Sequence, residues 1–275
     1  MNLALERARE APFIDCKSLL RVDLKGCTKL TSVGNGAFAA CSSLTSMVLP
    51  DTLTQLGESA FNQCSSLTSV VLPDSLTQIG FGVFQVCTSL TSVVLPDSLT
   101  QLGEHAFDGC TSLTSVALRD SLTQLGKAAF ARCTSLTSIV LPNSLTQLGE
   151  CAFGGCSSLT SVVLPDSAEL GDEVFLECDA LVQKAALAGF DTVEPYLRDR
   201  YKSITLRKLF LRLLRKYNKA VNDVVGTEAE KHATALAQFP ADDSSTLEVG
   251  LFLQKMSTSG GDGVKGLVGY IFEFV

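Results

Sequence analysis

Six cysteines recur at a constant interval of 23 residues, and this interval constrains the fold more than any other feature of the chain. They are Cys41, Cys64, Cys87, Cys110, Cys133 and Cys156. Around each one the chain repeats C-[ST]-S-L-T-S-[VMI]-[VA]-L-P-[DN]-[ST]-L-T-Q-[LI]-G-x-x-[AV]-F-x-x with few changes. A fixed period of this length is typical of a solenoid, in which single units cannot bury their apolar face and stacking builds a continuous core. The sequence therefore predicts a stack of similar rungs.

The first part of each unit has the composition of a short strand. In the copy CTSLTSVVLPDSLTQLGEHAFDG, the segment LTSVVLP is rich in β-branched residues and ends at a proline, which cannot donate a hydrogen bond to a neighbouring strand. Side chains alternate along a strand, which places Leu90, Val93 and Leu95 inside and Ser92 and Val94 outside. We expect this strand to pair with its copies in the adjacent rungs.

The second part of the unit returns the chain to the next rung. LTQLG is a second extended piece, and Gly103 at its end is suited to a left-handed turn. EHAF then makes a tight or helical turn that places Phe107 in the core. Stacked rungs lie about 4.8 Å apart, so equivalent side chains align. The predicted core contains a phenylalanine spine (Phe38, Phe61, Phe84, Phe107, Phe130, Phe153, Phe175) and a leucine column (Leu44, Leu67, Leu90, Leu113, Leu136, Leu159).

The L-x-x-V-x-L strand and the P-D-S-L-T-x-[LI]-G-x-x-A-F-x-x-C continuation resemble the 23-residue leucine-rich repeats of BspA-like or treponemal surface antigens. The resemblance covers residues 16–180. It implies a curved repeat solenoid of short parallel strands whose surfaces bind proteins, and it implies no enzymatic chemistry and no cofactor. Ser98 stands where most leucine-rich repeats place Asn or Cys, so a buried asparagine ladder is not expected.

We divide the chain into an N-terminal cap (1–15), a leucine-rich repeat solenoid (16–177) and an α-helical C-terminal region (178–275). In the last region, ITLRKLFLRLLRKYNKAV has apolar residues at helical spacing and a basic stripe on the opposite face. The stripe consists of Lys208, Arg212, Arg215 and Lys219. We expect this helix to cap the open end of the solenoid, and a docking surface for an acidic partner or an anionic membrane is the alternative.

The cysteines do not have the spacing of a metal site. Such sites need close pairs, and the nearest pair here is Cys151 and Cys156. A cysteine repeated once per rung is better interpreted as a small buried residue, which predicts a ladder of free thiols and an intracellular, reducing compartment, cytoplasmic or organellar. Cys151 lies at a variable position and is the candidate for a reactive thiol.

No catalytic set is visible. The chain has two histidines, His105 and His232, and His105 occupies a variable position that predicts a solvated surface residue. The serines and aspartates belong to the repeat, and no nucleophile, base and orienting group can be assembled from them. GDGVKG at 261–266 matches G-x-G-x-x-G, but no strand precedes it and it is interpreted as a flexible loop. We expect a protein that is not an enzyme and has no metal or cofactor.

Charge and hydropathy limit the partners. Residues 1–177 hold 9 Lys/Arg and 17 Asp/Glu, while residues 178–275 hold 13 and 12, within totals of 22 and 29. An acidic repeat surface argues against nucleic acid, whose phosphates require basic residues. No segment has the length of apolar sequence that a membrane helix needs, and the first residues lack the apolar core of a secretory signal.

We therefore predict a protein-interaction scaffold, with membership of a larger complex as an option. The expected contact is an apolar strip on the concave face, with a secondary anchor at Phe81, an aromatic residue where other rungs carry charge. The strip consists of Val48, Val71, Val94, Val140 and Val163. A cell-surface adhesin or antigen is the alternative function, and an ice-binding solenoid built on the threonine columns is a remote one.

Overall fold

The computed structural model describes residues 13–165 and 167–200. The chain divides into two compact units, Met1–Tyr201 and Lys202–Val275, and the predicted boundary at residue 177 falls inside the first. The basic stripe (Lys208, Arg212, Arg215, Lys219), His232 and the GDGVKG segment lie outside the described residues. The first unit contains all the repeats.

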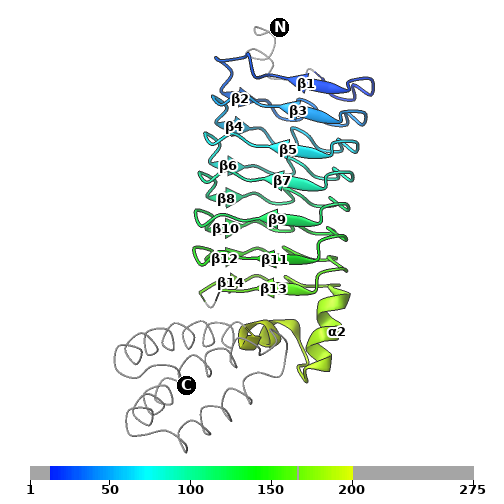
Figure 1. Ribbon diagram of the computed structural model, residues 1–275, viewed down its shortest axis with the longest axis vertical. Coiled ribbons are helices and arrows are strands. Elements are labelled where there is room, and N and C mark those ends of the chain that lie inside the picture. Colours follow the sequence, from blue (N-terminus) through cyan, green and yellow to red (C-terminus); the bar gives the residue numbers. More distant parts are fainter. Residues whose placement is uncertain (1–12, 166, 201–275) are drawn as a thin grey trace, which may run out of the picture. The chain divides into compact units, whose positions relative to one another are not determined.

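One side of the stack is built from three-residue strands, one in each rung (Figure 1). These are β1 (Arg21–Asp23), β3 (Ser46–Val48), β5 (Ser69–Val71), β7 (Ser92–Val94), β9 (Ser115–Ala117), β11 (Ser138–Val140) and β13 (Ser161–Val163). They form three parallel sheets, β1-β3, β5-β7-β9 and β11-β13. Within each sheet the rungs pair in register, so that Val93 lies between Val70 and Val116. Their middle residues are buried and the flanking residues face outward, as the alternation predicts.

The second extended piece forms a separate column of two-residue strands. These are β2 (Ser32–Val33), β4 (Gln55–Leu56), β6 (Gln78–Ile79), β8 (Gln101–Leu102), β10 (Gln124–Leu125), β12 (Gln147–Leu148) and β14 (Glu169–Leu170). Five of them form one parallel sheet in the order β14-β12-β10-β8-β6. The glutamines of β6 to β12 align with one another, and Glu169 takes this position in β14. The Leu or Ile that follows faces the core.

The turn that carries phenylalanine closes each rung without helix. Its backbone donates hydrogen bonds to the following rung at every second residue: Ser59 N to Phe81 O is 2.8 Å, and Gln63 N to Gln85 O is 2.7 Å. Two residues of each turn adopt positive φ, for example Ala128 at 52° and Arg132 at 57°. The helical form of this turn, left open by the sequence, is thus replaced by a third ladder between rungs.

The phenylalanine spine is confirmed. Consecutive rings from Phe38 to Phe175 stack nearly parallel, with centroids 5.3–5.8 Å apart. Phe13 extends the spine by one ring, 5.2 Å from Phe38. Its place was detectable in the sequence, because Phe13 precedes Cys16 by the same interval as Phe38 precedes Cys41. The spine therefore begins inside the segment predicted as a cap.

The glycine at the end of the second strand has a different role from the one expected. Gly103 is not among the residues with positive φ. A Cβ atom there would lie 2.7 Å from the carbonyl oxygen of Ile79 in the preceding rung, too close for any side chain. Glycine is therefore required at position 103 because the backbones of adjacent rungs approach closely, and the left-handed turn predicted there is wrong. The same holds for the equivalent glycines from Gly57 to Gly171 other than Gly80, where a Cβ atom would lie 3.6 Å from its nearest neighbour.

Hydroxyl and thiol groups form ladders where an asparagine ladder is absent. Ser98 Oγ donates to the carbonyl oxygen of Leu76 at 2.8 Å, and the equivalent serines repeat this contact. Cys87 Sγ lies 3.2 Å from the carbonyl oxygen of Phe61, and the other ladder cysteines do the same. Each rung thus satisfies a buried carbonyl of an earlier rung through a side chain, which the cost of unpaired buried polar groups favours.

Helices follow the last rung. Helix α2 (Asp179–Leu187) begins directly after Cys178 and buries Leu181 and Ala185, and residues 193–200 are also helical. Val193, Tyr196 and Leu197 belong to the same buried cluster as the repeats. These helices cover apolar surface that the final rung would otherwise expose.

Candidate functional site

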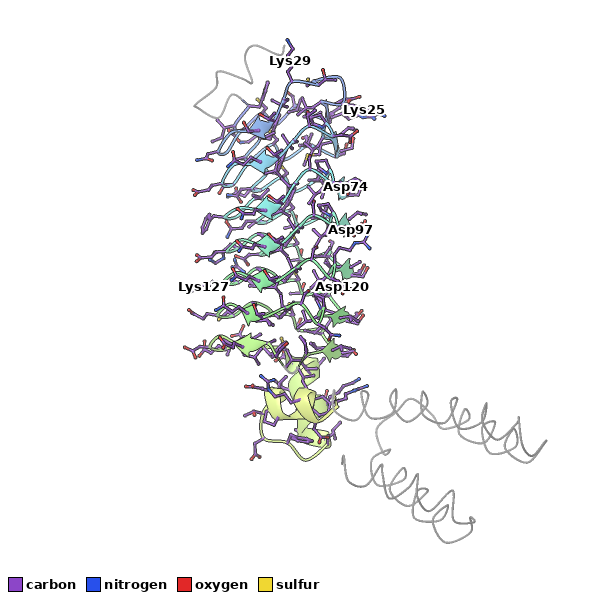
Figure 2. The ribbon with its side chains drawn as sticks, turned by 90° about the vertical axis from the view of Figure 1, so that its left-hand side faces the viewer. Lys25, Lys29, Asp74, Asp97, Asp120 and Lys127 are labelled. Atoms are coloured by element: carbon purple, nitrogen blue, oxygen red, sulfur yellow. The ribbon has the colours of Figure 1, made fainter. Side chains whose placement is uncertain are left out.

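The outer face of the three-residue strands carries the valine strip (Val48, Val71, Val94, Val140, Val163). The first four side chains are 41–66% exposed, and Val163 is half-buried. Ala117 fills the position between Val94 and Val140, which leaves a low point in the strip. Charged residues lie at the edges: Asp74, Asp97 and Asp120 follow one another along one edge of the stack (Figure 2). The strip is thus an uncharged apolar row bordered by polar ones.

Serine and threonine rows lie beside the valine strip. The threonine hydroxyls are used within the stack: Thr91 Oγ1 donates to the carbonyl oxygen of Thr68 at 3.1 Å, and Thr160 Oγ1 to that of Thr137 at 3.2 Å. Their hydrogens are therefore not available to an external acceptor. This geometry gives no specific support to the ice-binding alternative, which stays a prediction.

A shallow groove of about 700 Å³ follows the second column of strands. Its lining repeats a glutamine, a leucine or isoleucine and a glycine in the middle rungs, and Glu104 and Glu169 also line it. Among the described residues no lysine or arginine lines it, so it offers amide groups and two carboxylates and no positive charge. The groove residues are the same in nearly every rung, and the groove therefore provides little chemical discrimination along its length.

Phe81 lies on the turn side of the stack, in the column that carries Glu58, Glu104 and Lys127 in other rungs. Its side chain is 43% exposed. The ring meets His105 edge to face, with ring centroids 5.5 Å apart. Phe81 is consequently held in place by one neighbour while part of the ring remains accessible.

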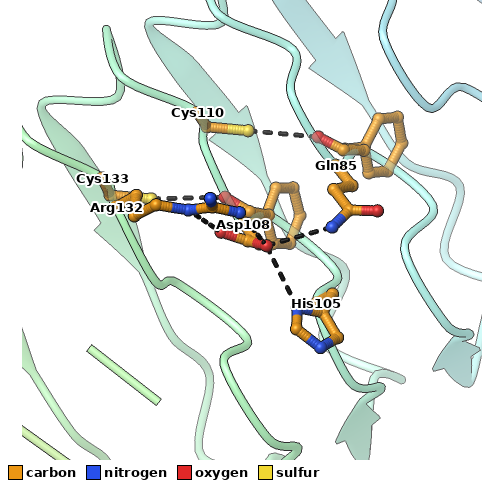
Figure 3. A network of polar contacts seen from close by, with 8 residues as sticks. Gln85, His105, Asp108, Cys110, Arg132 and Cys133 are labelled. Carbon is orange, nitrogen blue, oxygen red and sulfur yellow. Dashed lines mark hydrogen bonds and ion pairs between the residues drawn. The ribbon is translucent and has the colours of Figure 1, made fainter. Parts of the chain in front are cut away.

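A polar network next to Phe81 was not predicted from the sequence. Asp108 is 1% exposed, and no other charged residue among residues 13–165 and 167–200 is buried. Arg132 binds its carboxylate through two contacts, Nε to Oδ1 at 2.9 Å and Nη2 to Oδ2 at 2.7 Å. Gln85 Nε2 and His105 Nδ1 each lie 3.0 Å from Oδ2 (Figure 3). His105 is thus not a simple solvated residue, as the sequence indicated, but part of a network that crosses three rungs.

The network controls the charge of Asp108. Burial alone would raise the pKa of its carboxyl, but the hydrogen bonds from Arg132, Gln85 and His105 outweigh burial and lower it below its ordinary value of 3.8. The same contact raises the pKa of Arg132. Both groups are therefore charged at neutral pH.

The ladder cysteines are free, buried thiols. Burial raises the pKa of Cys64, and likewise of Cys110, to about 12, so the reactive thiolate is scarce at neutral pH. Cys151 is half-buried, outside the ladder, with Sγ 3.9 Å from a carboxylate oxygen of Glu173. Partial burial and the acidic neighbours Glu173 and Glu150 raise its pKa as well. Its accessibility, and not a lowered pKa, distinguishes it from the ladder.

Two further features of the described part of the chain bear on function. Residues 13–165 and 167–200 bring no three His, Cys, Asp or Glu side chains together in a way that could hold a metal ion. Within the same residues, no helix has both the length and the apolar character needed to cross a bilayer.

Comparison with known proteins gives one family and several solved structures. The family described as BspA type leucine-rich repeat region matches residues 6–134 and 55–182, with six copies. A leucine-rich repeat protein of T. pallidum is similar at 35% identity, covering 57% of this chain and 75% of that one, with a TM-score of 0.54. A leucine-rich repeat protein from Eubacterium ventriosum is 22% identical, with 57% and 42% covered and a TM-score of 0.52.

A third structure, described as a leucine rich cell surface protein from Faecalibacterium prausnitzii, is 25% identical, with 62% and 60% covered and a TM-score of 0.43. No curated protein matches the chain.

Proposed function

Because the chain belongs to the BspA-type leucine-rich repeat family, we propose that it is a non-enzymatic recognition protein that binds a protein partner through the valine strip. One observation carries the proposal. Valine side chains in four rungs stay 41–66% exposed, and the fold does not require an apolar residue there, because Asp23 takes the equivalent position in the rung before Val48. An apolar row flanked by hydroxyl groups is typical of the centre of a protein interface.

The strip suits a protein better than a small molecule. Its outward rows are flat and repeat the same residues, so they provide contact area and no enclosed cavity. Recognition by such a surface depends on excluding water along several rungs, and a single charge in the strip should disturb it. The concave position that we predicted for the strip remains part of the proposal.

The test introduces charge into the strip and compares it with charge elsewhere. Val71→Glu, Val94→Glu and Val140→Glu together should abolish capture of the partner, identified from the native source by affinity capture and mass spectrometry. The control is Gln78→Glu, Gln101→Glu and Gln124→Glu, which adds equal charge to the other column of strands in neighbouring rungs. Capture that survives the valine changes and disappears in the glutamine control would refute the proposal.

For location we favour the cell surface, in line with an antigen or adhesin, over the reducing compartment that the thiols led us to predict. The ladder thiols are buried, bound to carbonyl oxygens and have raised pKa values, so they resist oxidation outside the cell as well. Free cysteines therefore do not indicate a compartment here. Labelling intact source cells with a membrane-impermeant reagent tests the location: the protein should be labelled, and protection until lysis would contradict it.

A further inference from the structure

Charged and polar residues at variable positions of the repeat form one cluster on the turn side. The rungs are nearly identical, so the residue at each position can be compared with the residues at the same position in the other rungs. At the position of Asp108, the two following rungs carry Ala131 and Gly154. Arg132 stands where Gly109 and Gly155 stand in the adjacent rungs. Unlike the threonine or glutamine columns, this cluster is not a by-product of repetition.

Stability does not explain the cluster. Placing a carboxylate in the interior removes it from water, and an ion pair with a half-exposed partner often only compensates for that loss. The rung with Gly154 and Gly155 keeps the same turn and the same backbone ladder without either member of such a pair. The buried charge therefore has an effect that the fold does not need.

That effect is to fix the orientation of an exposed guanidinium group. The fork from Nε and Nη2 to Asp108 uses one edge of the group, while the Arg132 side chain remains 63% exposed. Nη1 and the second hydrogen of Nη2 take no part in this fork. His105, bound to the same carboxylate, contacts the Phe81 ring edge to face. The oriented guanidinium and the partly exposed ring are thus connected through Asp108 and His105.

The chemistry of these two groups specifies their partner. N–H groups on a positive residue favour an oxygen acceptor with negative charge, and the Phe81 ring favours an apolar side chain next to it. A polyanion such as nucleic acid does not fit, because the column of Phe81 also carries Glu58, Glu104 and Glu150. Lys127, in the same column, is already paired with Glu150. A single carboxylate beside an apolar residue does fit.

We propose that Phe81, His105 and Arg132, positioned by Asp108, form a turn anchor that binds an Asp or Glu side chain next to an aromatic or large apolar residue in an exposed segment of the protein partner. The proposal rests on the proposed protein-binding function, but it places a second contact away from the valine strip. Asp108 acts here as a positioning residue, since it does not itself face the partner.

The probe is a random dodecapeptide library displayed on phage and selected on the immobilised full-length chain. Counter-selection uses the double variant Asp108→Ala and Arg132→Gly, which gives each of the two rungs a residue found at the same position in an adjacent rung and avoids an unpaired buried charge. This variant should melt at least as high as the wild type. Arg119→Ala is the matched control, because Arg119 is an exposed arginine that pairs with Asp97 at another edge.

Peptides that remain after counter-selection should share an acidic residue next to an aromatic or large apolar one. The affinity of a synthetic copy should fall at least about tenfold in the double variant and in Phe81→Ala, and less than about twofold in Arg119→Ala. Enrichment of peptides without an acidic residue, or equal binding to the double variant, would overturn the turn anchor. The valine-strip variant should still bind the peptide, so failure of the strip and failure of the anchor give different results.

Discussion

Replacement of Phe107 by alanine tests the packing that holds the rungs together. The ring is fully buried and lies between Phe84 and Phe130, each 5.4 Å away between centroids. Truncation of a buried phenylalanine costs about 3–5 kcal/mol, and the cost grows with the cavity that remains. Backbone ladders fix both neighbouring rings, so the cavity cannot collapse. We therefore expect a loss near the upper limit, about 5 kcal/mol.

Two other phenylalanines provide the comparison. Among the described residues, Phe175 stacks on one ring, that of Phe153, and it is 8% exposed, so Phe175→Ala should cost less, about 3 kcal/mol. Phe81 is largely outside the core, and Phe81→Ala should cost less than about 1 kcal/mol. Urea unfolding followed by far-ultraviolet circular dichroism measures the three free energies of unfolding. Equal losses for Phe107→Ala and Phe81→Ala would refute the spine as the main source of stability.

Three further predictions concern the thiols, the buried carboxylate and the helices. Cys64, Cys87, Cys110 and Cys133 should resist alkylation in the native chain while Cys151 reacts, and rapid labelling of the whole ladder without denaturant would overturn their burial. Their folded pKa values lie above the ordinary 9.0, so the stability they contribute is complete below pH 9 and should fall as pH rises towards 12. Asp108 has a lowered pKa, so its contribution to the free energy of unfolding is present above pH 3.8 and is lost in stronger acid. Asp108→Asn should remove that part of the pH dependence of the melting temperature. Deletion of residues 178–275 should cause aggregation, detected by light scattering. Deletion of 201–275 should not, because Leu181, Ala185 and Val193 then still cover the last rung. A monomeric product of the 178–275 deletion would show that the last rung needs no cover.

The periodic part of the fold could be predicted from the sequence because the repeat period alone indicates which distant residues come into contact. Once rungs stack in register, Phe84, Phe107 and Phe130 must meet, and the exposed row of valines follows from alternation along three-residue strands. The family resemblance agreed with this geometry, and the family match confirms it.

The remaining features depend on contacts between unlike positions of different rungs. The Asp108 and Arg132 pair joins residues 24 positions apart, one more than the repeat, and the register of their turns had to be known before they could be paired. Gly103 was assigned to a turn because its sequence neighbours gave no sign of how closely the preceding rung approaches. For Ser98 the sequence predicted only that an asparagine ladder is missing. Its hydroxyl donates a hydrogen bond to the carbonyl oxygen of Leu76, a contact between rungs that was not predicted.

Site-specific photocrosslinking tests the central claim, that a partner binds the face formed by the valine strip, most directly. A benzoylphenylalanine at Val94, in the middle of the strip, is compared with one at Gln101 in the neighbouring column of strands of the same rung. Each full-length variant is irradiated in an extract of the native source, and crosslinked proteins are identified by mass spectrometry. We predict one dominant crosslinked partner from position 94 and none from position 101. A partner that crosslinks from position 101, and not from position 94, would contradict the account.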